Sequence, residues 1–210
     1  MTRDPDQESD LNAYIQFLKE RIFFEPQSAV FHYNLGLAYT RKRLIEDAIS
    51  EFKQAIECDP NLAEAHVNLG GLLFRKGDLD GAIEANLKAL SLNPELPMAH
   101  SNLALVYMQK GEYQHSIASS LRAVELNPRL IHAYNNLAVG YLHLEQPEPS
   151  IQASLKILEI DGRFAPAHFT LAVGYRMLGQ MDLARKSLQT AKELGYPVDS
   201  ETEAEFQDRA

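Results

Sequence analysis

Apolar and small residues recur along this chain with a period of 34 residues. Five segments follow that interval: FHYNLG (31–36), AHVNLG (65–70), AHSNLA (99–104), AYNNLA (133–138) and AHFTLA (167–172). Prolines keep the same spacing, at Pro26, Pro60, Pro94 and Pro128. Self-similarity at a fixed period of this length is typical of proteins that stack copies of one structural unit.

The pattern within one period predicts two helices. We number positions 1 to 34 in each repeat, starting from Ala29, Ala63, Pro97, Ile131 and Ala165. Position 7 is leucine in all five repeats, and positions 8 and 20 are small. Positions 4, 7, 8 and 11 share one stripe of a first helix, A, and positions 20, 24 and 27 share one stripe of a second helix, B. A glycine at position 15 suits the turn between them, and proline at position 32 ends helix B.

The period and these residues resemble the tetratricopeptide repeat (TPR) family over residues 29–198. The resemblance implies an all-α fold, a right-handed superhelix (an α-solenoid) of five helix-turn-helix repeats with terminal capping helices. The predicted repeats are 29–62, 63–96, 97–130, 131–164 and 165–198. Because a single helix pair cannot bury its apolar face, stacked neighbours are expected to bury it together.

Both ends of the chain are predicted to cap the stack. Residues 1–10 are expected to form an acidic, flexible N-terminus, and residues 11–28 a capping helix with helically spaced apolar residues. Residues 199–210 are expected to be an acidic tail or a short capping helix. A capping box of Ser200 and Glu203 would begin that helix.

Charge and composition narrow the classes of function. Most of the net charge of −9 lies in the two termini, which leaves the repeat region nearly neutral. A nucleic-acid-binding protein would carry a basic stripe, so that class is excluded. The sequence shows no membrane span and no secretion signal, and its one cysteine, Cys58, fits a reducing compartment. We therefore expect a cytoplasmic protein.

Candidate chemistry is sparse. Histidine occupies position 4 in four repeats, at His32, His66, His100 and His168. These rings either pack in the core or at its rim, or neighbouring rings share a metal ion, although no HxxxH or CxxC motif accompanies them. The sequence contains no nucleophile elbow and no phosphate-binding loop. The prediction is a protein that is not an enzyme, with no cofactor and no metal.

Position 6 carries the most informative residues. It is asparagine in the first four repeats, at Asn34, Asn68, Asn102 and Asn136. In a TPR stack this position of helix A faces the concave surface, so the resemblance implies a row of amides there. An amide can hold a peptide backbone through its donors and its acceptor. The alternative is that these asparagines bond to the adjacent helix or only to water.

Further residues are expected on the same surface, at positions 2, 5, 9, 12 and 13. The apolar ones predicted to contact a peptide are Leu37, Phe74, Leu105, Met108, Val139 and Leu142, with Val173 and Met177 at matching positions. Arg41 and Arg75, and Arg176 in the last repeat, are predicted to engage acidic groups of the ligand. The alternative is that some of these apolar side chains fill the interior of the superhelix.

The leading hypothesis is a protein–protein interaction scaffold or adaptor that binds an extended peptide of a protein partner. The asparagine row makes the repeats similar to the repeat region of O-linked N-acetylglucosamine transferase, where concave asparagines bind substrate backbone. The alternatives are a self-assembling structural protein, so homo-oligomerisation stays open, and an accessory subunit of an enzyme complex.

Position 25 bears on self-assembly. Leu87, Leu121 and Leu155 lie there, each after an unusually small or polar residue at position 24. Either helix B is rotated so that these leucines enter the core, or they form an exposed stripe suited to self-association.

Overall fold

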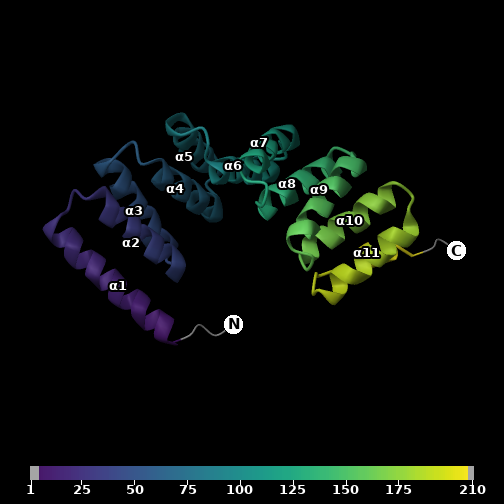
Figure 1. Cartoon of the computed structure of the whole chain (residues 1–210), viewed down its shortest axis with the longest axis horizontal. Coiled ribbons are helices and arrows are strands. Elements are labelled where there is room, and N and C mark those ends of the chain that lie inside the picture. Colours follow the sequence, from purple (N-terminus) through teal and green to yellow (C-terminus); the bar gives the residue numbers. More distant parts are fainter. Residues whose placement is uncertain (1–4, 208–210) are drawn as a thin grey trace. The chain divides into compact units, whose positions relative to one another are not determined.

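The described part of the chain is helical throughout. The computed structural model describes residues 5–207, and every regular element in that range is a helix. The chain divides into two compact units, residues 1–102 and 103–210, with the division inside α6 (Pro97–Gln109). Within each unit, helices joined by short turns form successive pairs (Figure 1).

The helices follow the repeat period. The first unit contains α1 (Pro5–Phe24), α2 (Ala29–Lys42), α3 (Ile45–Cys58), α4 (Ala63–Lys76), α5 (Leu79–Leu92) and the first half of α6. The second contains the rest of α6, α7 (Tyr113–Leu126), α8 (Ile131–His143), α9 (Pro147–Ile160), α10 (Ala165–Met177), α11 (Met181–Glu193) and α12 (Ser200–Ala204). The A helices are α2, α4, α6, α8 and α10, and each begins at position 1 of its repeat.

The turn between helices A and B has the same backbone in every repeat. Position 15 takes positive φ at three glycines, and also at Arg43 (63°) and Glu145 (55°), where glycine is absent. The amide after position 15 bonds to a carbonyl five residues back, as Asp78 does to Leu73 at 3.0 Å. This bond closes the helix end in the Schellman manner, so the turn geometry is kept even where the residue is unfavourable.

Helices A and B approach closely where the residues at positions 8 and 24 are complementary in size. A Cβ placed on Gly36 would lie 2.9 Å from the Phe52 ring, and one on Gly70 would lie 2.1 Å from Asn86 Nδ2. In the third and fourth repeats position 8 is alanine, and position 24 is serine. In these four repeats a larger residue at one position is thus accompanied by a smaller one at the other, as close packing requires, whereas the fifth repeat pairs Ala172 with Leu188.

The leucines of position 25 lie on the surface. Asn86, Ser120 and Ser154 at position 24 are fully buried, whereas Leu87, Leu121 and Leu155 are 49%, 47% and 36% exposed. The first of the two interpretations, a rotated helix B with leucine in the core, is therefore wrong. The small residues at position 24 already fill the space beside helix A, so no rotation is needed.

The N-terminal helix caps the first unit. α1 buries Ile15 and Leu18 in the core that α2 and α3 share. The helix begins at Pro5 rather than at Leu11, so residues 5–10 are helical where a flexible tail was expected. Proline is well suited to the first turn of a helix, and acidic residues near that end favour the helix dipole. The remainder of that expected tail, residues 1–4, lies outside the described residues.

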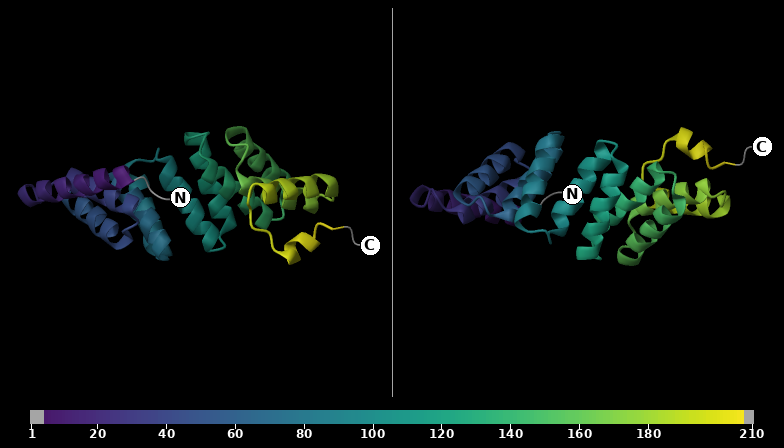
Figure 2. Two further views of the ribbon diagram at one scale, coloured as in Figure 1. Left: turned by 90° about the horizontal axis from the view of Figure 1, so that it is seen from below. Right: turned by 90° about the horizontal axis from the view of Figure 1, so that it is seen from above.

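The C-terminal segment folds back on the last repeat. After α11 the chain turns and forms α12, which ends near the C-terminus (Figure 2). Its N-cap is Asp199, whose carboxylate accepts from the Thr202 amide at 2.7 Å, so the capping box of Ser200 and Glu203 is wrong. Phe206 is 3% exposed and packs with Leu188 of α11, because the chain leaves helical geometry before this residue. Residues 208–210 of the predicted tail lie outside the described residues.

Candidate functional site

The asparagines of position 6 in the first unit are half-buried on A helices, and two of them bond to neighbouring side chains and carbonyls. Asn68 Nδ2 donates to the Tyr33 hydroxyl at 3.2 Å and to the Glu64 carbonyl at 2.8 Å. Asn102 Nδ2 donates to the Val67 carbonyl at 3.2 Å and to Asn86 Oδ1 at 3.1 Å.

The nitrogen and the oxygen of each of these two amides differ in their hydrogen bonding. An amide nitrogen carries two N–H donors, so both donors of Asn68 and of Asn102 are used within the stack, and the bond to Glu64 lies inside α4 itself. Their Oδ1 atoms have no hydrogen-bond partner among the residues that the structure describes. An amide oxygen of this kind is an acceptor, the type of group that pairs with the N–H of a peptide backbone.

Tyr33 supports this arrangement. Burial raises the pKa of the Tyr33 hydroxyl, the Asn68 amide lowers it by donating a hydrogen bond, and the nearby Glu64 carboxylate raises it. The net effect is a raised pKa, so the hydroxyl stays protonated at neutral pH and keeps its own donor while it accepts from Asn68.

Asn136, the fourth member of the predicted row, differs from Asn68 and Asn102. It is 6% exposed on α8. Its neighbour Asn135, at position 5, lines a pocket on the same helix, and Asn136 does not. In the second unit the asparagine that lines a pocket is therefore one residue earlier than the sequence predicts.

The pocket of the second unit lies between α8 and α10 and has a volume of about 400 Å³. Val139, Leu142, Val173 and Met177, which were predicted for the ligand-facing surface, all line it. The remaining lining residues are Asn135, His143, Pro166, Phe169, Thr170 and Tyr196. All but Tyr196 occupy positions 2, 5, 6, 9, 12 or 13 of helix A, which we call the A-helix face.

The other predicted contact residues are not gathered in this pocket. Leu37 packs, half-buried, against the core of the first unit, and Phe74 and Met108 are half-buried as well. Leu105 is 40% exposed. Arg41 and Arg75 are exposed in the last turns of α2 and α4.

Comparison with known families identifies the repeat. Family models described as TPR repeat match residues 45–77 and 70–111, and one described as tetratricopeptide repeat matches residues 99–130. Residues 45–130 carry tetratricopeptide repeats. No protein of curated function matches its sequence.

Solved TPR structures share the fold. MamA is 25% identical, with a TM-score of 0.69 over 87% of this chain and 97% of that one. YrrB, a TPR protein with an unusual peptide-binding site, is 20% identical, with a TM-score of 0.70 over 85% of this chain and 92% of that one. PilF of Pseudomonas aeruginosa is 20% identical, with a TM-score of 0.72 over 94% of this chain and 81% of that one.

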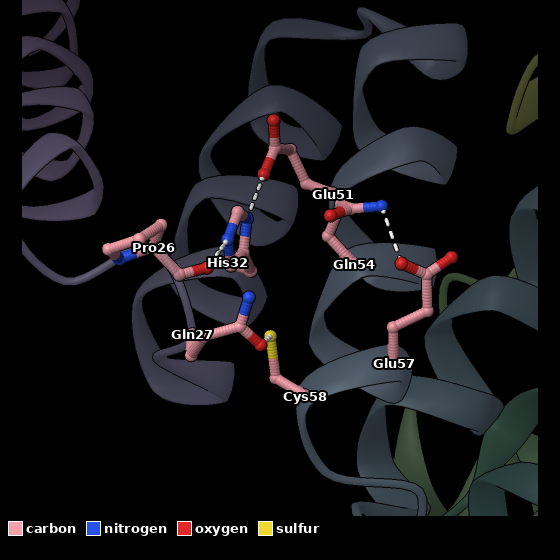
Figure 3. Close-up of polar contacts among 7 residues, drawn as sticks. All are labelled: Pro26, Gln27, His32, Glu51, Gln54, Glu57 and Cys58. Carbon is pink, nitrogen blue, oxygen red and sulfur yellow. Dashed lines mark hydrogen bonds and ion pairs between the residues drawn. The ribbon is translucent and has the colours of Figure 1, made fainter.

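The histidines of position 4 support the TPR turns. Nε2 of His32, His66, His100 and His168 lies 3.1–3.2 Å from the carbonyl six residues earlier, at Pro26, Pro60, Pro94 and Gly162. His32 Nδ1 also lies 2.7 Å from a Glu51 carboxylate oxygen (Figure 3). Each histidine thus ties the start of an A helix to the preceding turn.

No group of three or more potential metal ligands occurs among the described residues. None of the described helices combines the length and apolar character that crossing a bilayer requires.

Six of the ten lining residues were not predicted from the sequence, and Phe169 and Tyr196 are two of them. Phe169 lies at position 5, which was expected to face the ligand, but that position is mixed and gives no apolar pattern. Tyr196 follows the last B helix, in a segment without repeat register. Its ring stacks on Phe169 with centroids 4.6 Å apart, a contact that periodicity cannot predict.

Proposed function

We propose that this chain is a protein-interaction scaffold that holds an extended segment of a partner protein against the A-helix faces of its repeats. The observation that carries the proposal is the pocket between α8 and α10, which is lined by apolar residues from the predicted ligand-facing positions. Apolar side chains that converge on an open pocket are typical of binding sites. The fold is also one on which YrrB carries a peptide-binding site.

The position-6 amides contribute recognition of the peptide backbone. In the first unit, Asn68 and Asn102 keep their N–H donors in the stack and present Oδ1 to the ligand. Asn34 has the same position on α2, and in the second unit Asn135 takes the place of the buried Asn136. The resemblance to O-linked N-acetylglucosamine transferase, in which concave asparagines bind backbone, motivates this role.

The side chains beside the amides contribute affinity. Leu105, at 40% exposure, offers apolar surface that a partner can cover. Arg41 and Arg75 lie near the ends of their A helices, where acidic groups of the partner would meet them. Removal of apolar surface from water then supplies most of the binding free energy, and the amides supply direction.

A random peptide library selected on the intact chain tests the proposal. Peptides that bind should lose about tenfold or more in affinity, or about 1.4 kcal/mol, on the double variant Asn68→Ala/Asn102→Ala and on Leu105→Ser. Leu121→Ser is the matched control, since this leucine is similarly exposed but lies on a B helix.

The stability of each variant is measured alongside, because the two asparagines also join helices. Unchanged affinity in folded variants would refute the assigned residues. Failure to select any peptide would refute the function.

Self-association is the second candidate, and one observation favours it. Leu121 and Leu155 of the second unit and Leu87 of the first are exposed on B helices, away from the A-helix face. Single exposed leucines are common, but recurrence at one repeat position favours a shared contact with a second copy. Sedimentation at increasing concentration decides: a monomer throughout excludes it, and a dimer lost in Leu121→Ser/Leu155→Ser supports it.

A further inference from the structure

Asn135, which lines the pocket between α8 and α10, carries a buried polar atom whose bonding is incomplete. Asn135 Oδ1 is buried and has no hydrogen-bond partner among the described residues. A buried acceptor without a donor is costly, and such groups in folded proteins generally have a partner in the functional state. A rotation of the Asn135 side chain toward the pocket would let a donor from a ligand complete the bonding of this oxygen.

The rest of the pocket wall restricts the chemistry of that ligand. No lysine, arginine, aspartate or glutamate lines it, so a charged group would enter without a counter-ion. The Thr170 hydroxyl already donates to the Pro166 carbonyl at 3.0 Å. The wall therefore fits a neutral ligand with a large apolar part and one N–H or O–H donor.

A large apolar residue within a peptide has both features, an apolar side chain and an N–H donor close to it. Its backbone N–H and its side chain are attached to the same Cα, so both can enter one small site. The volume of about 400 Å³ exceeds that of one large side chain and leaves room for the adjoining backbone.

We propose that this pocket selects one large apolar residue, such as leucine, methionine or phenylalanine, in an extended partner segment. The side chain of that residue packs between Val139, Val173 and Phe169, and its backbone N–H donates to Asn135 Oδ1. This assignment rests on the proposed function and adds to it the kind of residue that the second unit recognises.

The C-terminal segment completes the pocket. Tyr196 stacks on Phe169 at 4.6 Å between ring centroids and at 20° between ring planes. The segment beyond it is held by an ion pair of Arg176 with Glu205 at 2.5 Å and by a bond from Arg185 Nε to the Phe206 carbonyl at 2.9 Å. Because Tyr196 is a wall of the site, the segment assists binding rather than competing for the groove.

Backbone N-methylation of a selected peptide tests the assignment. The probe is a fluorescein-labelled peptide obtained from the library selection on the wild-type chain, and its analogues carry one N-methyl group each. At one apolar residue, N-methylation should weaken binding about tenfold, which is the loss expected for about one hydrogen bond. The same N-methyl group should change affinity less than about twofold on Asn135→Ala, because the acceptor is already absent.

Two further variants separate the outcomes. Tyr196→Ala should weaken the binding of the same peptide, and Leu183→Ser, at a leucine that is 46% exposed on the B helix α11, should bind it as wild type does. If a peptide binds but Asn135→Ala and Tyr196→Ala leave its affinity unchanged, the pocket assignment is overturned while the scaffold function stands. Stronger binding by Tyr196→Ala would also overturn it, since the segment would then be a competitor. If no peptide binds, the scaffold function itself fails.

Discussion

The pairing of small and large residues at positions 8 and 24 predicts how substitutions in the second repeat change the free energy of unfolding. An alanine at Gly70 would place its Cβ 2.1 Å from Nδ2 and 2.8 Å from Cγ of Asn86. Asn86 is fully buried and donates to the Ala82 carbonyl at 2.7 Å, so its amide cannot move away without losing that bond. Gly70→Ala should therefore destabilise the chain.

The expected size follows from three contributions. Overpacking in a core costs about 1–3 kcal/mol. Displacing the Asn86 amide from Ala82 costs about 1 kcal/mol, and replacing glycine by alanine inside a helix returns about 1 kcal/mol. The last two nearly cancel, so Gly70→Ala should lower the free energy of unfolding by about 1–3 kcal/mol.

A second substitution should remove the conflict. With Asn86→Ser the second repeat acquires the alanine and serine pair that the third and fourth repeats have at positions 8 and 24. Asn86→Ser alone costs about 1–2 kcal/mol, since it leaves a small cavity and takes a partner from Asn102. Adding Gly70→Ala to it should then cost less than about 1 kcal/mol, which gives a coupling of about 2 kcal/mol between the two sites.

Urea unfolding followed by far-UV circular dichroism measures all four members of this cycle. Gly71→Ala is the matched control, because its Cβ would meet only Asn102 Nδ2, at 3.5 Å. This change should stabilise the chain by about 1 kcal/mol through helix propensity. Additive effects of Gly70→Ala and Asn86→Ser, with a coupling below about 0.5 kcal/mol, would refute the size-matching argument.

Three further predictions concern other single residues. Ser120→Ala should raise the free energy of unfolding by about 1 kcal/mol, because its buried hydroxyl has no partner, whereas Ser116→Ala should lower it by about 1 kcal/mol, because Ser116 donates to the Ala104 carbonyl at 2.7 Å; urea unfolding that shows equal effects would contradict this. Glu145→Gly should raise the thermal midpoint, since it relieves about 1 kcal/mol of left-handed backbone strain at φ 55°, and an unchanged midpoint would count against that strain. Phe206→Ala should release α12 and expose residues 199–207 to limited proteolysis, with the repeats intact; protection equal to wild type would show that Phe206 does not hold the segment.

The sequence predicts the TPR repeats well because their core residues recur. Leu35 and its counterparts at position 7 occupy the same stripe in every repeat, so one period specifies both helices and the start of the next pair. The C-terminal segment shows the opposite case. Phe206 has no counterpart in any repeat, and its burial depends on a turn after α12 that no period encodes.

The candidate site was predicted only in part, because periodicity identifies a helix face but not the partner of each polar group. Asn68 and Asn136 occupy the same position, yet Asn68 is half-buried beside Tyr33, whereas Asn136 is 6% exposed. The difference arises from the residues around each, which vary between repeats. Asn135 lines the pocket because the residues around it also differ from those of the other repeats. Its role depends on contacts that one sequence does not reveal.

The amides of position 6 join stability to recognition. Asn102 donates to Val67 on α4 and to Asn86 on α5, so its orientation is set by the stack before any partner arrives. An acceptor held in place by two internal bonds loses little side-chain entropy when a ligand binds, which favours affinity. Asn86, which accepts from Asn102, is itself kept in place by its close packing against Gly70. The packing of position 8 against position 24 therefore helps to fix the orientation of the acceptors on the A-helix face. A substitution that alters this packing should change both the free energy of unfolding and the affinity for a peptide.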